Sequence, residues 1–187
     1  MTIENTIKKI CENALNPLDN VSKNGVKTVN EFMINCELLT DFNNIDIRKD
    51  PNFKTLFDNI QKINGPTVYY FEVISEHQSI EIIKALSKYS ITLDAKTTPP
   101  LNPRYSKGQI LYVGKVKKTM WGRLIQHLGF YKVDKTQGLQ LYYWAKTIPL
   151  TLKLVVFEFE PEMTTLVGII EKELAQILNP ILGKHKD

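Results

Sequence analysis

A phenol, a guanidinium and an imidazole follow one another in a short stretch of this chain. Tyr112 comes two positions before Gly114, and Arg123 and His127 follow, four positions apart. Three lysines lie between the glycine and the arginine: Lys115, Lys117 and Lys118. Side chains of these types can bind an anion and transfer a proton. They fit a nucleotide phosphate loop, a nucleic-acid contact surface or an ordinary exposed turn.

The glycine pattern excludes the first of these interpretations. A phosphate loop of the Walker type needs GxxxxGK followed by Ser or Thr, whereas Gly114 in YVGKVKK (112–118) has no partner glycine. The HExxH, GxSxG and GxGxxG motifs are also absent from the sequence. The contact surface and the exposed turn therefore remain.

Charge is distributed unevenly along the chain. The net charge is only +4, but the segment 95–157 holds eleven lysines and arginines against one acidic residue, Asp134. This basic segment overlaps two aromatic-rich stretches, 110–131 and 139–144. Scattered lysines alone would indicate a solvated face. Cations interleaved with aromatic rings favour an anionic partner, most simply a nucleic-acid backbone.

Composition is that of a globular protein. The 187 residues suffice for one domain with an extension, and 43% of them are apolar. The N-terminus does not resemble a signal peptide, and no apolar run reaches the ~18 residues of a membrane span. Cys11 and Cys36 are isolated and are interpreted as reduced thiols. We therefore expect a cytoplasmic protein that does not associate with a membrane.

Hydrophobic periodicity and turn residues predict two regions. Residues 1–64 are expected to form a helical N-terminal extension, with helices at 2–15, 29–39 and 51–63. Residues 65–187 alternate predicted strands and helices. The strands are expected at 67–74, 109–114 and 152–159, and the helices at 79–89, 119–128 and 163–178. The predicted fold is α/β (α+β), with a small, mainly antiparallel three-stranded sheet flanked by helices.

The segment 119–128 has one apolar stripe at helical spacing. The stripe consists of Trp121, Leu124, Ile125 and Leu128. By the same count, Arg123 and His127 point away from it and are expected to face solvent.

Four features in order resemble the GIY-YIG endonucleases. They are TVY at 67–69, YVG at 112–114, Arg123 and EKELAQILNPILG at 171–183. In that family the two tyrosine motifs lie on neighbouring strands, an arginine follows on the next helix, and a glutamate on a later helix binds a divalent metal. The resemblance covers about 65–78 and 108–187.

The sequence departs from the family pattern at three places. Thr67 stands where the family usually has glycine, and Gly183 stands where it often has asparagine. Tyr69 and Tyr112 are 43 positions apart, so residues 75–107 are expected to be an insertion made of a helix and a proline-rich loop. Residues 137–144, where family members vary, are expected to contact substrate.

The resemblance implies metal-dependent cleavage of DNA. Glu171 would hold Mg²⁺ or Mn²⁺, and Arg123 would clamp the phosphate. Either Tyr69 or Tyr112 would act on the attacking water. His127, together with Lys115, would lower the pKa of that tyrosine, or His127 would itself relay the proton.

DNA contacts are expected from the turn after the second tyrosine motif. Gly114 would let the backbone approach DNA, and Lys115, Lys117 and Lys118 would bind its phosphates. Two other interpretations remain open: a nucleic-acid-binding domain that does not cleave, and an interaction protein that works through its helical N-terminus.

Overall fold

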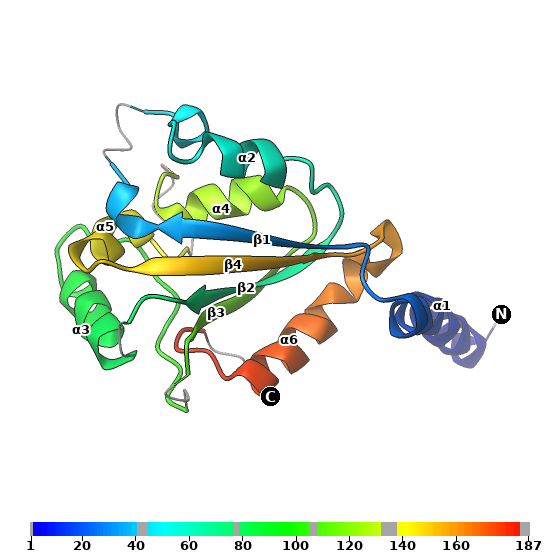
Figure 1. Cartoon of the computed structure of the whole chain (residues 1–187). Coiled ribbons are helices and arrows are strands. Elements are labelled where there is room, and N and C mark those ends of the chain that lie inside the picture. The colour runs from blue at the N-terminus through cyan, green and yellow to red at the C-terminus, as the bar shows by residue number, and fades with distance from the viewer. Residues whose placement is uncertain (1, 41–44, 77–78, 105–107, 132–137, 184–187) are drawn as a thin grey trace.

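A four-stranded antiparallel sheet forms the centre of the protein in a computed structural model that describes residues 2–40, 45–76, 79–104, 108–131 and 138–183. Its strands lie in the order β1-β4-β2-β3 (Figure 1). They are β1 (Thr28–Asn35), β2 (Thr67–Val73), β3 (Ile110–Val116) and β4 (Thr151–Glu158). The two strands that carry the tyrosine motifs, β2 and β3, are hydrogen-bonded neighbours, and β3 is an edge strand.

Helices cover both faces of this sheet. They are α1 (Ile3–Asn24), α2 (Lys54–Ile60), α3 (Ser79–Ser90), α4 (Met120–Leu128), α5 (Leu141–Trp144) and α6 (Val167–Leu178). In Figure 1, α2 and α4 lie on one face, and α6 lies on the other with α1 at its end. Among the described residues, none of these helices is long and apolar enough to span a membrane.

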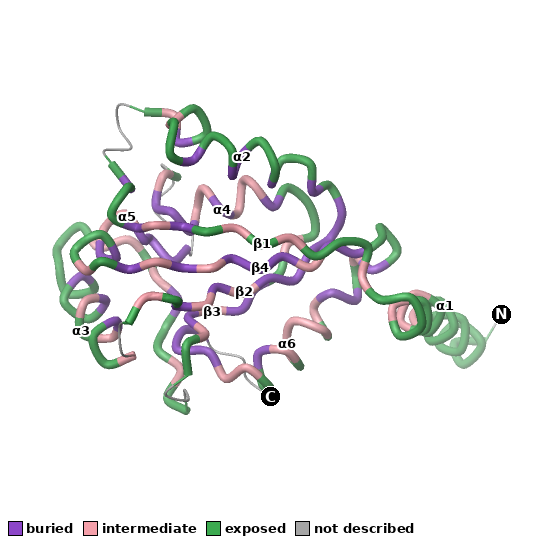
Figure 2. Tube along the Cα trace, viewed as in Figure 1, coloured by how far each residue is buried: buried purple, intermediate pink, exposed green. Residues whose placement is uncertain are grey.

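The alternation of side chains along β2 separates two apolar layers. Tyr69 and Phe71 point into the larger one, which includes Leu124 of α4 and Phe57 of α2. Val68 points into the smaller one, which α6 and the C-terminal half of α1 complete. Figure 2 shows the buried positions concentrated on β2 and β4, the two central strands.

The α+β class is confirmed, but the sheet has one strand more than predicted. The additional strand is β1, which lies where the sequence predicted a helix at 29–39. It pairs with β4 along its whole length, from Thr28 opposite Glu158 to Asn35 opposite Thr151. Alternate residues turn toward the larger core layer, and Ile34 is fully buried there. Pairing with a long neighbouring strand outweighs the weak helical periodicity of this segment.

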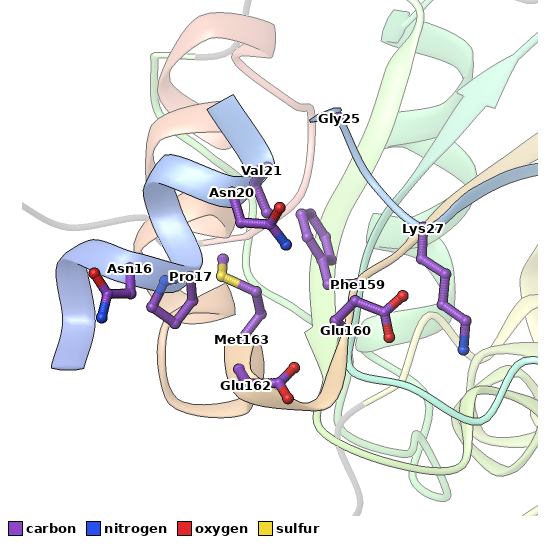
Figure 3. A pocket seen from close by; sticks show the side chains of 10 residues that line it. All are labelled: Asn16, Pro17, Asn20, Val21, Gly25, Lys27, Phe159, Glu160, Glu162 and Met163. Carbon is purple, nitrogen blue, oxygen red and sulfur yellow. The ribbon is translucent and has the colours of Figure 1, made fainter. Parts of the chain in front are cut away.

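The prediction of a helix at the start of the chain is confirmed, and that helix is longer than predicted. The C-terminal half of α1 packs through Ala14, Leu18 and Val21 against the smaller core layer. A cavity of about 230 Å³ remains between this half and the turn that contains Phe159 and Met163 (Figure 3). Because β1 joins the sheet, residues 1–64 are not helical throughout.

Candidate functional site

The pairing of β2 with β3 places both motif tyrosines on one face of the sheet. Tyr69 lies opposite Gly114, and Phe71 lies opposite Tyr112. The ring centroids of Tyr69 and Tyr112 are 6.4 Å apart. Helix α4 packs over this face and carries Arg123 and His127 to the tyrosines. Residues that are far apart in the sequence therefore meet in one cluster.

Hydrogen bonds connect the members of this cluster. Arg123 Nε donates to the Tyr69 hydroxyl oxygen at 3.2 Å, and that oxygen lies 2.7 Å from His127 Nε2. The Leu139 backbone N–H donates to His127 Nδ1 at 3.2 Å. Because Nδ1 accepts a hydrogen bond, the imidazole proton is on Nε2, which donates to Tyr69. The Tyr69 oxygen thus accepts two hydrogen bonds, from Arg123 and from His127.

His127 does not face solvent as the helical count predicted. It is fully buried, because the segment that contains Leu139 and Trp144 packs over α4. Burial and the nearby charge of Arg123 hold the pKa of His127 well below its ordinary value. A neutral imidazole cannot supply positive charge to a tyrosine. That charge comes from Arg123, which acts against the burial that raises the pKa of Tyr69 and Tyr112.

Stability should therefore depend on pH through His127. Its folded pKa lies below the unfolded value of about 6.5, so its contribution to stability is fully present above pH 6.5 and is lost as the pH falls below it. We expect the free energy of unfolding to drop by up to ~1.4 kcal/mol per pH unit in this range. Chemical denaturation between pH 7.5 and pH 5 measures it. A His127→Gln variant should lack this slope, and an identical slope in both proteins would contradict the assignment.

The two tyrosines differ in their access to solvent. Tyr69 is fully buried, whereas Tyr112 on the edge strand is only partly buried. Burial is the main cause that raises the pKa of both phenols, and the charge of Glu171 acts in the same direction. Hydrogen bonds and charge from Arg123 act against it. Tyr112 therefore keeps some contact with solvent, while the buried Tyr69 accepts a hydrogen bond from Arg123.

Gly114 makes room for the tyrosines. It is buried, and a Cβ atom there would lie 2.6 Å from the Tyr69 hydroxyl oxygen and 2.7 Å from Tyr112 Cε1. The sequence suggested that this glycine lets the backbone approach DNA. The structure gives a different physical reason, because any side chain at this position would displace the Tyr69 hydroxyl from Arg123.

Gly114→Ala should destabilise the protein. The added methyl group meets two rings that the core holds in place, and such overpacking costs about 1–3 kcal/mol. Gly168→Ala is the matched control, since its Cβ would lie 3.5 Å from the flexible Lys115 side chain, an ordinary contact. Alanine within α6 should be neutral or stabilise by up to ~1 kcal/mol. Urea denaturation of both variants measures the difference, and equal stabilities would contradict the packing account.

Glu171 and Lys115 form an ion pair next to the cluster. Glu171 projects from α6, and its carboxylate contacts Lys115 Nζ. The Glu171 side chain is only 14% exposed, whereas Glu173 is exposed. Because side chains alternate along β3, Lys115 leaves the strand on the side of α6, opposite to the tyrosines. The charge of Glu171 nevertheless acts on Tyr69 and Tyr112 across this edge strand.

A single carboxylate is the donor set that this site offers to a metal. Within the described ranges, no group of three or more His, Cys, Asp or Glu side chains could hold an ion. Mg²⁺ keeps several waters and is commonly held by one or two carboxylates together with substrate phosphates. Glu171 fits an ion of that kind, provided that Lys115 gives up its contact. It does not fit a metal caged by protein ligands alone.

The predicted DNA-binding lysines are not all alike. Lys117 and Lys118 are exposed beside the start of α4, whereas Lys115 is engaged with Glu171. Three other cations of the basic segment, Lys107, Lys132 and Lys135, lie outside the described residues, as do the acidic Asp134 and position 137 of the predicted substrate-contacting segment.

Gln126 also belongs to the site, although the sequence analysis did not single it out. Gln126 Oε1 accepts a hydrogen bond from Arg123 Nη1 at 2.7 Å. Its position three residues after the arginine, on the same helix face, was the available signal. The burial of His127 depends on a distant segment and had no such local signal.

Comparison with known proteins adds no relative. No protein-family model, curated protein or solved structure matches this chain.

Proposed function

We propose that this protein is a metal-dependent DNA endonuclease of the GIY-YIG type. The observation that carries the proposal is the bonding of Arg123 to Tyr69 on one face of paired strands β2 and β3, beside Tyr112 and within range of the charge of Glu171. The fold brings these residues together from positions as far apart as 69 and 171 in the sequence. Their meeting is what a phosphodiesterase site requires, since catalysis there depends on positioning and charge neutralisation.

Arg123 has the chemistry to bind the scissile phosphate. Its Nε and Nη1 atoms are held by Tyr69 and Gln126, so the orientation of the guanidinium plane is fixed. A guanidinium in a fixed orientation can donate to phosphate oxygens and neutralise charge that develops on them. Tyr69 and His127 act as positioning residues in this account, because both are fully buried behind Arg123.

Tyr112 is the better candidate for contact with the attacking water. Its phenol is the partly exposed one. Burial raises the pKa of this phenol, and the neighbouring Arg123 acts against that rise. Deprotonation of the water by the phenolate would create the hydroxide that attacks phosphorus, and the proton would remain on the Tyr112 oxygen. The bond from phosphorus to the departing oxygen of the DNA strand then breaks, and that oxygen takes a proton from solvent.

Glu171 would hold the divalent ion. Such an ion, Mg²⁺ or Mn²⁺, supplies Lewis-acid stabilisation of charge on a phosphate oxygen when it is bound. In the absence of substrate, Lys115 neutralises the same carboxylate. The role of Lys115 in this account is to orient the Glu171 carboxylate against the edge strand β3.

A non-cleaving nucleic-acid-binding domain is the alternative, and the Lys115–Glu171 ion pair favours it, because the carboxylate is already neutralised. Nicking of supercoiled plasmid DNA by the purified protein in Mg²⁺ but not in EDTA supports the nuclease. DNA binding without nicking supports the alternative.

DNA affinity should fall steeply with salt if the basic segment contacts phosphates. Each phosphate neutralised contributes ~0.9 to the slope of log K against log salt concentration. Replacement of Lys117 and Lys118 by alanine should therefore reduce the slope by up to ~1.8, as measured by fluorescence anisotropy with a labelled duplex. Alanines at Lys8 and Lys9 of α1 are the matched control and should leave it unchanged. An unaltered slope in the first variant would mean that these two lysines only solvate the surface.

A further inference from the structure

A groove lies directly beside Arg123. Its volume is about 360 Å³, and its lining includes Lys118, Trp121, Arg123 and Tyr131. This volume is near the lower end of the range for small-molecule pockets. The lining combines two aromatic rings with two cations, the pair of chemical types that binds a nucleotide through its base and its phosphate.

Aromatic rings and lysines continue outward from this groove. Lys96 Nζ donates to the Tyr131 backbone carbonyl at 3.1 Å and lies 5.4 Å from the ring centroid of Tyr143. The rings of Tyr143 and Tyr142 are 5.1 Å apart, and Lys146 Nζ lies 3.8 Å from the centroid of Tyr142. We call this set the aromatic–lysine track. It consists of Trp121, Tyr131, Lys96, Tyr143, Tyr142 and Lys146.

The rings of the track are held by neighbours while they keep contact with solvent. Arg48 packs over Trp121 at 5.6 Å, and Tyr143 stacks on Tyr89 with centroids 5.7 Å apart. Trp121 and Tyr143 are partly exposed, and Tyr131 is 40% exposed. Cations over surface rings also occur as ordinary packing. Here, however, Trp121 and Tyr131 line one groove with Arg123, Lys96 links the Tyr131 backbone to the ring of Tyr143, and the rings of Tyr143 and Tyr142 are adjacent.

We propose that the aromatic–lysine track binds an unpaired strand of DNA that leads away from the phosphate at Arg123. In a paired duplex the bases stack on one another and are closed to protein rings. In an unpaired strand each base can stack on an aromatic side chain while lysines contact the backbone. The substrate class is therefore DNA with unpaired nucleotides next to the cleaved bond. The cleavage part of this statement rests on the proposed function, whereas the binding part does not.

Binding in EDTA tests the track without any cleavage. Tyr131→Ala should weaken the affinity for a labelled single-stranded oligonucleotide about tenfold, because one stacking partner is lost. Tyr131→Phe keeps the ring and should bind like the unmodified protein. Tyr70→Ala removes a partly exposed ring from the opposite face of the sheet and should also leave this affinity unchanged. Equal affinity of Tyr131→Ala and the unmodified protein would overturn the proposal.

Cleavage then separates the two proposals. In Mg²⁺, a duplex with a short unpaired stretch should be cut faster than the same duplex fully paired, and Tyr131→Ala should remove this preference. If no DNA is cleaved but Tyr131→Ala still weakens binding of the single strand, the nuclease proposal is wrong and the proposal that the track binds an unpaired strand is supported. If fully paired DNA is cut as fast as the unpaired substrate by both proteins, the nuclease stands and the track is overturned.

Discussion

Arg123→Lys should reduce DNA cleavage by ~10²-fold or more while DNA affinity stays nearly unchanged. The charge is kept, but the planar fork is lost. Lysine has three N–H groups, so bonds to Tyr69 and Gln126 would leave only one for a phosphate, without the planar fork of a guanidinium. Rates of plasmid nicking under single-turnover conditions, together with duplex affinity in EDTA, separate the two effects.

Arg104→Lys is the matched control for this substitution. It makes the same chemical change in a loop where the backbone of Arg104, through its N–H and its carbonyl, bonds to Asn102 and Asn179. Its cleavage rate should equal that of the unmodified protein. Normal cleavage by Arg123→Lys would place Arg123 among the structural residues of α4 and remove the main support for a nuclease.

Glu171→Gln should abolish metal-dependent cleavage and leave DNA affinity equal or higher. The amide cannot supply the negative oxygen that Mg²⁺ requires, and the loss of a negative charge frees Lys115 for a phosphate. Glu173→Gln should change neither property, because that side chain is exposed on the same helix. Plasmid nicking and duplex affinity measured for both variants test the assignment.

The two glutamates are a sharp comparison because helical periodicity cannot distinguish them. The family resemblance alone favoured Glu171 in the sequence, because both glutamates flank the apolar stripe of this segment, which consists of Val167, Ile170, Leu174, Ile177 and Leu178. Equal loss of cleavage in both variants, or loss only in Glu173→Gln, would show that the metal is held elsewhere. If Glu171→Gln still cleaves DNA, the ion pair between Glu171 and Lys115 has no role in catalysis.

The sequence predicted the elements that carry the site better than the sheet that unites them. Strands β2, β3 and β4 and helices α3, α4 and α6 lie at the expected places, because each has a clear local period and flanking turn residues. The strand β1 was mistaken for a helix. Its identity depends on pairing with β4, more than one hundred residues later in the chain, and local periodicity carries no information on such a partner.

Among the site residues, too, only those features that depend on the neighbouring sequence could be predicted. Arg123 could be selected from its position on a helix after the second tyrosine motif. That His127 is buried and neutral could not be predicted, because the Leu139 N–H that fixes its tautomer and the packing of Trp144 belong to another segment. The contact between Lys115 and Glu171 likewise joins residues on two elements that meet only in the folded chain.

The most direct test of the central claim is incubation of the purified protein with supercoiled plasmid DNA in Mg²⁺ and in EDTA, with Arg123→Lys in parallel. If the nuclease assignment is right, we expect nicked and linear products for the unmodified protein in Mg²⁺, intact plasmid in EDTA, and a rate at least ~10²-fold lower for the variant. Intact plasmid in Mg²⁺, or equal rates for the two proteins, would contradict it.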